Sequence, residues 1–141
     1  MQNIYQSSQW KIFDYGLFSP DNKLLVVKKF SEEIEIYEAS SGNIKYTLKH
    51  TTYMSHTPAF RPDGLHFVTF DYRKMKIYDT KDFSCIKEIT TEESVDACAY
   101  TLNNNLLVCA SWRYIYIRDA NTWEIVNKIP NQQMTVELNV F

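Results

Sequence analysis

Glycine is scarce in this sequence, which has only three glycines, at positions 16, 42 and 64. A phosphate-binding loop needs several glycines within one short segment, so loops of that type are excluded. Long apolar runs are also missing, and none approaches the roughly 18 residues that a membrane-spanning helix needs. The first ten residues lack the basic start and the continuous apolar core of a signal peptide, so we expect no such peptide.

Positive and negative side chains nearly balance, and the formal net charge is −2. Bulk electrostatics therefore gives no basis for binding nucleic acid or an anionic membrane. The three cysteines, Cys85, Cys98 and Cys109, are odd in number and lack CxxC spacing. We interpret them as small buried side chains in a reducing compartment, with Cys98 and Cys109 close together on adjacent strands. The sequence thus predicts a cytoplasmic protein, with the nucleus left open and no membrane partner.

Motifs for metal binding and catalysis are also lacking. The three histidines, His50, His56 and His66, are scattered, and no cluster of potential ligands has metal-ligand spacing. We interpret His66 as a satisfied residue at the rim of the fold and the acidic pairs Glu32-Glu33 and Glu92-Glu93 as solvated turns. The sequence therefore predicts no metal, no cofactor and no enzymatic activity.

What the sequence does contain is a repeated unit. Phe18-Ser-Pro-Asp-Asn22 precedes Phe60-Arg-Pro-Asp-Gly64 by 42 residues, and Tyr100-Thr-Leu-Asn-Asn104 follows 40 residues later. Each unit then has a segment rich in β-branched or aromatic residues that ends in an acid: Ile34 to Glu38, Met75 to Asp79 and Ile115 to Asp119. A period of about 40 residues with four short strands per unit is typical of β-propeller blades.

Turn residues and period-two alternation divide each unit into four predicted strands, a to d. These are 13–18, 24–28, 33–37 and 44–48, then 56–60, 65–70, 74–78 and 84–89, then 95–100, 106–110, 114–118 and 123–129. A partial strand is predicted at 134–141, and residues 1–12 fall where the outer strand of a preceding blade would be. We therefore predict an all-β fold, with residues 1–141 as one propeller segment and repeats at about 13–49, 54–90 and 95–129.

These units resemble the WD-repeat family of β-propellers, in which a Phe-Ser-Pro-Asp-Gly turn follows strand a and a Trp-Asp pair ends strand c. The turn is well kept at Phe18-Ser-Pro-Asp-Asn22 and Phe60-Arg-Pro-Asp-Gly64. The pair is replaced by Tyr37-Glu38, Tyr78-Asp79 and Arg118-Asp119. The aspartate that the family has in the turn between strands b and c is replaced by Ser31, Arg73 and Arg113. The hydrogen-bonded tetrad of well-kept repeats is therefore mostly missing, and we expect packing to stabilise the blades.

Three blades are fewer than a closed propeller needs, since such rings typically have four to eight. In an open set of three blades, the apolar face at each end of the set would be exposed to water. Three explanations remain open: a piece of a larger propeller, closure with a second copy, or completion by blades of another chain.

The resemblance also implies a binding surface. Family members commonly contact partners through the residue just before the hairpin aspartate, which here is Phe30, Tyr72 or Trp112, with Arg73 and Arg113 beside two of them. Asp14, His56 and Asp96 occupy the same end of strand a. Aromatic residues with arginine are the composition of interaction hot spots. The alternative is that the aromatic residues merely cover their own hairpins.

We therefore predict a protein–protein interaction scaffold that binds proteins or peptides through this face. The first alternative is an assembly subunit whose blades complete a propeller with itself or another chain. The second is a ligand or enzymatic site at the central channel, for which Asp14, His56 and Asp96 are the only candidates. Stacking of a single-stranded nucleic acid on Tyr72 and Trp112 is conceivable, but the acidic charge balance argues against it.

Overall fold

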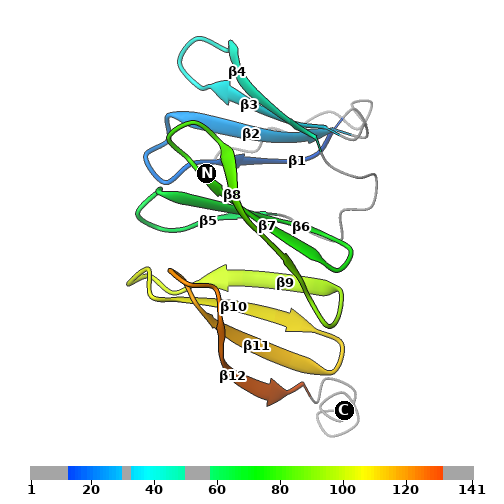
Figure 1. Cartoon of the computed structure of the whole chain (residues 1–141). Helices are drawn as coiled ribbons and strands as arrows, with labels where there is room; N and C mark the ends of the chain where they lie inside the picture. The colour runs from blue at the N-terminus through cyan, green and yellow to red at the C-terminus, as the bar shows by residue number, and fades with distance from the viewer. Residues whose placement is uncertain (1–12, 30–32, 50–57, 132–141) are drawn as a thin grey trace, which may run out of the picture. The chain divides into compact units, whose positions relative to one another are not determined.

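The computed structural model describes residues 13–29, 33–49 and 58–131, and these contain strands and turns but no helix. The chain forms two compact units, residues 1–54 and residues 55–141. The first contains one four-stranded sheet and the second contains two, and every strand pair is antiparallel (Figure 1). The predicted all-β fold of four-stranded units is therefore confirmed.

In the first unit, neighbouring strands of the sheet are also neighbours in the sequence. They are β1 (Phe13–Phe18), β2 (Leu24–Lys29), β3 (Glu33–Glu38) and β4 (Ile44–Lys49). The second unit repeats this order twice, with β5 (Ala59–Phe60), β6 (His66–Asp71), β7 (Lys74–Asp79) and β8 (Ser84–Thr90), followed by β9 (Val95–Tyr100), β10 (Leu106–Ser111), β11 (Tyr114–Asp119) and β12 (Ile125–Pro130). We call these sheets the first, second and third.

Most predicted strands agree with the structure to within two residues. The described part of strand β5 begins only at Ala59, and residues 56 and 57 of the predicted strand lie outside the described residues. The outer strand predicted to begin at Trp123 begins at Ile125, because Trp123 adopts a left-handed backbone with φ 61°. The partial strand predicted at 134–141 lies outside the described residues, as do residues 1–12.

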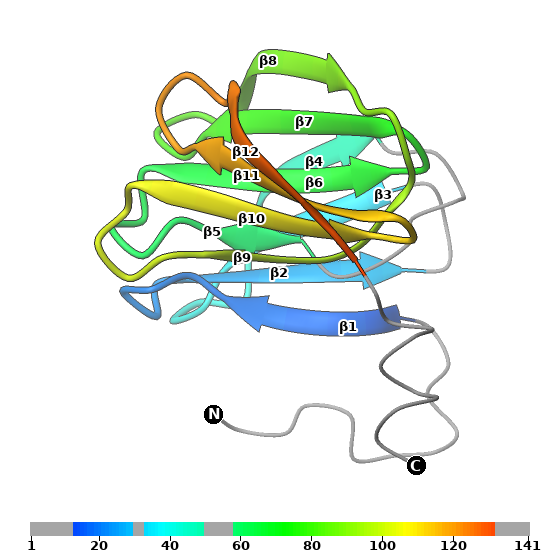
Figure 2. The same cartoon turned by 90° about the horizontal axis from the view of Figure 1, so that it is seen from below.

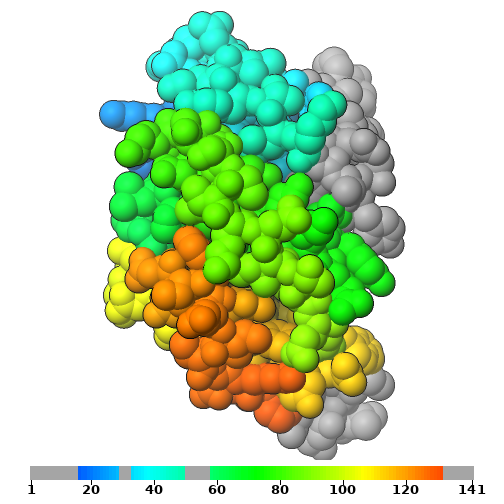
Figure 3. All heavy atoms as spheres, viewed as in Figure 1, coloured from blue at the N-terminus to red at the C-terminus, as the bar shows by residue number. Residues whose placement is uncertain are grey.

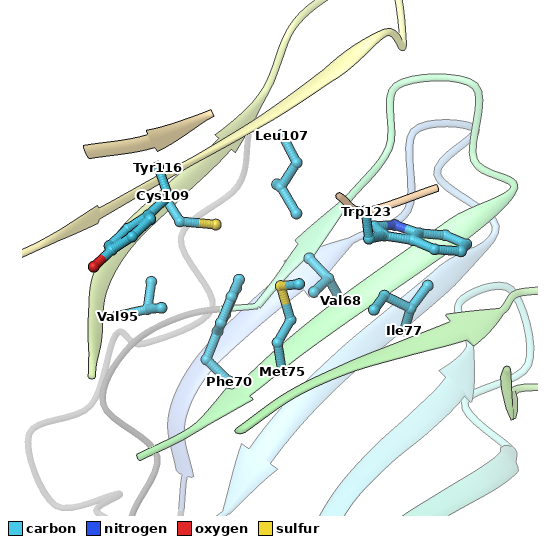
Figure 4. Packing of buried hydrophobic residues seen from close by; sticks show 9 residues of the cluster. All are labelled: Val68, Phe70, Met75, Ile77, Val95, Leu107, Cys109, Tyr116 and Trp123. Atoms are coloured by element: carbon cyan, nitrogen blue, oxygen red, sulfur yellow. The ribbon is translucent and has the colours of Figure 1, made fainter. Parts of the chain in front are cut away.

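The second and third sheets share one hydrophobic core. Side chains on alternate strand positions point to the same face, so each sheet contributes every second residue of its inner strands. Figure 4 shows the second sheet facing the third through nine buried residues: Val68, Phe70, Met75, Ile77, Val95, Leu107, Cys109, Tyr116 and Trp123. Each buried side chain of this size stabilises the fold by about 1.5–3 kcal/mol relative to exposure.

The outer strands of these two sheets lie on the surface. Every residue of β12, and every residue of β8 except Ile89, is exposed, and both strands are visible on the face in Figure 3. Figure 2 shows β12 running obliquely to β9, as the twist of a four-stranded sheet requires. A site that uses buried side chains must therefore lie on the other strands of these sheets or at the ends of the sheets.

The turns between strands a and b use the repeated motif directly. Ser19 Oγ donates to Asp21 Oδ1 at 2.7 Å, and Thr101 Oγ1 donates to Asn103 Oδ1 at 2.7 Å. The second sheet has Arg61 at this position, whose Nε donates to Asp63 Oδ1 at 3.0 Å. The same buried side chain also reaches the third sheet. There Arg61 Nη1 donates to the carbonyl of Ala120 at 3.2 Å and to Asn121 Oδ1 at 2.9 Å. Arg61, at the second position of the motif, therefore links the second sheet to the third at this end.

The turns between strands c and d need one residue with a left-handed backbone. That position is occupied by Gly42, Phe83 and Trp123, with φ of 76°, 54° and 61°. Each backbone N–H donates to the carbonyl of the acid that ends strand c, at 2.7–2.8 Å. Glycine adopts this conformation freely, whereas an aromatic residue does so at a cost in strain. Burial of the Phe83 and Trp123 rings offsets that cost.

Candidate partner-binding surface

Two hairpins lie at the same end of the second and third sheets, on the right of Figure 1. They join β6 to β7 around Tyr72 and β10 to β11 around Trp112. The connection from β8 to β9 lies against both hairpins. Its Thr91 N–H donates to the carbonyl of Arg73 at 2.7 Å, and the backbone N–H of Arg113 donates to Glu93 Oε1 at 3.0 Å. The hairpins are thus held on a common support.

We call the surface formed by Tyr72, Arg73, Asp96, Trp112 and Arg113 the hairpin surface. Its two aromatic side chains are 60% and 61% exposed, respectively, so neither is buried against its own hairpin. Tyr72 also has φ 55°, which is a rare conformation for a bulky residue. The exposure and the strain both weigh against the alternative that these rings serve only to cover the turns.

The two arginines of the hairpin surface are each held through the same atom. Arg73 Nε donates to the carbonyl of Thr91 at 3.1 Å. Arg113 Nε lies 3.5 Å from Glu93 Oε1, in an ion pair whose arginine side chain is largely exposed. Within the described part of the chain, Arg73 forms no ion pair with an acidic side chain. Both guanidinium groups are therefore oriented by the β8–β9 connection.

Two predictions are corrected at Glu93: that this residue is solvated, and that packing alone stabilises the blades. It was expected to be solvated, but its side chain is only 11% exposed. Its Oε2 accepts a hydrogen bond from the Tyr116 hydroxyl at 2.9 Å, while Oε1 accepts the bond from Arg113. Packing is therefore not the only support of the third sheet, because this carboxylate joins the β8–β9 connection, the hairpin and β11. Burial and the neighbouring carboxylate raise the pKa of Tyr116, so its hydroxyl stays protonated.

Asp96 stands at an irregularity of the sheet. In β9 the pairing passes from Val95↔Ser111 to Ala97↔Ala110, which leaves Asp96 as the extra residue of a bulge. Asp14 holds the equivalent place in β1, between Phe13↔Lys29 and Tyr15↔Lys28. Bulges redirect a side chain and are frequent beside functional sites. The two aspartates predicted at equivalent positions therefore share one backbone feature.

The other three predicted site residues cannot be assigned to this surface. Phe30 and His56 lie outside the described residues. Asp14 belongs to the first unit, whereas the hairpin surface belongs to the second. The structure therefore brings together five of the eight predicted residues. Sequence reasoning missed Glu93 and Thr91, which position the two arginines but belong to no recognisable motif.

His66 differs from its prediction as a satisfied rim residue. Its side chain is half-buried, and its Nδ1 has no hydrogen-bond partner within the described ranges. The imidazole ring lies 5.3 Å from the Trp123 ring, measured between centroids. Burial lowers the pKa of His66, so the ring is neutral at pH 7.

A small pocket opens beside the third sheet, with about 210 Å³ of empty volume including space open to solvent. It is lined by Thr91, Glu92, Val95, Cys109, Ser111, Tyr116 and Arg118. Burial raises the pKa of Cys109 to about 12, so at pH 7 this thiol is not a nucleophile. In the described ranges no three His, Cys, Asp or Glu side chains are grouped as metal ligands.

Comparisons with known proteins point to the fold. No protein-family model and no curated protein matches this sequence. A solved structure of WD40 repeats of RRP9 matches with a TM-score of 0.73 and 14% identity over 90% of this chain and 41% of its own. U3-55K matches with a TM-score of 0.75 and 14% identity, over 87% of this chain and 40% of its own. The chain has the fold of a partial WD-repeat β-propeller.

Hydrazine synthase of Kuenenia stuttgartiensis matches equally well, with a TM-score of 0.75 and 17% identity over 93% of this chain. The present chain spans only about two fifths of the length of these three proteins. Because one of them is an enzyme by name, the propeller fold alone does not distinguish catalysis from binding. None of the described residues forms a helix long and apolar enough to cross a membrane.

Proposed function

We propose that this chain is a protein-interaction module that binds a partner protein through the hairpin surface. The observation that carries the proposal is the exposed, left-handed Tyr72. Strained residues tend to persist where function requires them. An exposed tyrosine in this conformation contributes little to the fold, so a contact with another molecule explains its presence best.

The composition and support of the surface agree with this role. Tyrosine, tryptophan and arginine are the residues most enriched among interaction hot spots. Their side chains stand on two hairpins fixed by hydrogen bonds to one connection, so little conformational freedom is lost on binding. Catalysis lacks comparable support, since the nearby pocket presents a neutral thiol and a tyrosine whose hydroxyl is already engaged.

The test is affinity capture from a cell extract, with quantitative mass spectrometry of the bound proteins. Two variants remove the hairpin rings, Tyr72→Gly and Trp112→Ala. The matched control is Leu102→Ala, which removes a side chain that is 90% exposed in the β9–β10 turn at the other end of the third sheet. A protein captured by the wild type and the control, but lost with both hairpin variants, would support the proposal. An unchanged set of captured proteins would refute it.

A second candidate function is assembly, and the face of the third sheet turned away from the second sheet favours it. Ile115 and Ile117 alternate with the buried Tyr116, so they lie on the face turned away from the shared core. Cross-strand pairing joins them to Ala110 and Val108, which makes this face apolar. Met75 and Ile77 hold the equivalent positions in the second sheet, where the third sheet packs against them. A further blade would pack on this face of the third sheet in the same way.

Mass in solution tests this second candidate. The chain has a mass of 16.7 kDa, so closure with a second copy gives about twice that value in light scattering. Ile115→Glu should convert such a dimer to the monomer, because a charge would have to be buried. A wild-type chain that is monomeric at all concentrations would contradict self-assembly.

A further inference from the structure

Arg73 and Arg113 of the hairpin surface use only part of their hydrogen-bonding capacity within the described residues. Each is held through Nε, by the Thr91 carbonyl in one case and the Glu93 carboxylate in the other. Within the described residues, the terminal Nη atoms of both side chains make no hydrogen bond or ion pair. Both arginines are exposed and are held at Nε, which leaves their Nη ends for a partner.

A forked guanidinium end matches a carboxylate or a phosphate, which it binds with two parallel hydrogen bonds. Each arginine directly follows an exposed aromatic ring, so an apolar group next to an anion has a place to pack. We propose that the hairpin surface binds an acidic segment of a partner protein, with its anionic groups on Arg73 and Arg113 and a ring on Tyr72 or Trp112. This inference rests on the proposed function and adds the chemistry of the partner.

Acidic residues near the hairpin surface would repel an anionic partner if their charges were unpaired. Glu93 has Arg113 as a partner, and Glu92 pairs with Lys128 at 3.1 Å, so each of these carboxylates has a cation beside it. Asp96 is exposed and lies on β9, which is the edge strand of the third sheet opposite β12. A continuous phosphate backbone crossing the hairpin surface would pass Asp96, whereas a peptide with separated acidic side chains can place them away from it. We therefore infer a protein segment in preference to a nucleic acid.

The experiment is selection of displayed random 12-residue peptides on the purified chain, with sequencing of the enriched pool. The expected pool has an excess of Asp and Glu together with an aromatic residue or proline. The double variant Arg73→Gln with Arg113→Gln should lower affinity for an enriched peptide by about tenfold or more. The matched control, Lys45→Gln with Lys87→Gln, also removes two positive charges, but from exposed positions on outer strands, and should change affinity by less than about threefold.

The outcomes separate this inference from the proposed function. Enriched peptides without acidic excess that still require Tyr72 and Trp112 would overturn the acidic partner and leave the binding surface standing. No enrichment, or enrichment indifferent to all four hairpin residues, would overturn both. Equal losses in the double variant and its control would show bulk charge only and would also overturn the inference. Tighter binding of a 12-nucleotide oligouridylate than of any peptide would overturn it in favour of a nucleic acid.

A further binding measurement distinguishes a phosphorylated partner from one whose anionic groups are carboxylates. Each glutamate of an enriched peptide is replaced by phosphoserine or by glutamine in turn. Tighter binding of the phosphoserine peptide assigns a phosphorylated partner, and tighter binding of the original assigns a carboxylate. Undiminished binding of the glutamine peptide would contradict the role of the arginine forks.

Discussion

Tyr72 and Phe83 adopt the same left-handed backbone, with φ of 55° and 54°, but only the Phe83 ring is buried. Phe83 is 4% exposed, and its ring meets Phe67 edge-on at 5.7 Å between centroids. Tyr72 is 60% exposed. The same backbone strain is therefore offset by packing in one turn and is not offset in the other.

This pair gives the first prediction. Tyr72→Gly should raise the free energy of unfolding by up to about 1 kcal/mol, because glycine relieves more strain than its extra freedom in the unfolded chain costs. Phe83→Gly should lower that free energy by about 2–4 kcal/mol, because the lost ring outweighs the same relief. Urea denaturation of both variants measures the two effects. Equal shifts in the same direction would show that burial is not what separates the two turns.

The sequence predicted the positions of most strands well, because their signals are local. Asn22, Gly64 and Asn104 each adopt a positive φ in the turn after strand a, and asparagine and glycine are the residues that tolerate it. Nothing comparable marks Phe83 or Trp123, since aromatic residues rarely adopt this backbone. Aligning them with Gly42 places them at one position, but only the packed structure shows that buried rings replace a glycine there.

The candidate site was less predictable for a related reason. The exposed hairpin positions of Tyr72 and Trp112 follow from the repeat, because hairpin turns recur with it. The role of Glu93 depends on Tyr116, which is 23 residues away, and on the path of the β8–β9 connection. Neither is visible in a local pattern of residues. Long-range hydrogen bonds of this kind come from packing and not from the motif.

The second prediction concerns Glu93. Glu93→Ala should lower the free energy of unfolding by about 2–3 kcal/mol, because it leaves the buried Tyr116 hydroxyl and the Arg113 N–H without their acceptor. Tyr116→Phe should lower it by about 1 kcal/mol, since only one bond is lost. The control is Glu92→Ala, whose exposed pair with Lys128 is worth less than about 1 kcal/mol. Similar losses for Glu92→Ala and Glu93→Ala in thermal and urea unfolding would contradict the special role of Glu93.

The third prediction concerns Arg61, which joins the second and third sheets. Its Nη2 pairs with Asp63 Oδ2 at 2.8 Å, and its Nη1 reaches Ala120 and Asn121. Arg61→Ala should lower the free energy of unfolding by about 2–4 kcal/mol, because the buried Ala120 carbonyl and the part-buried Asn121 oxygen lose their donor at the junction. Lys74→Ala breaks the half-exposed pair with Glu88 and should cost less than about 1 kcal/mol. If both variants unfold at the same urea concentration, Arg61 does not tie the sheets together.

The last prediction concerns alkaline pH. Burial raises the pKa of Tyr78 to about 12 and that of Cys109 to about 12, above the ordinary values of about 10 and about 8.5. A group with a raised pKa in the folded state holds its proton more tightly there than in the unfolded chain. Its contribution to stability is therefore complete below the unfolded pKa and is lost as pH rises towards the folded one. Burial also raises the pKa of Cys98. Stability should therefore begin to fall near pH 9, through these two thiols, and more steeply above pH 10.

Tyr78→Phe isolates the tyrosine. The variant lacks the ionising hydroxyl, so the difference in unfolding free energy between wild type and variant should be constant from pH 7 to 9. Above pH 10 the difference should shift in favour of the variant, by up to about 1.4 kcal/mol for each further pH unit until the folded pKa is reached. Urea unfolding at half-unit steps from pH 7 to 11.5 measures it. Parallel curves throughout this range would mean that Tyr78 ionises equally easily in both states, which its burial in the second sheet does not allow.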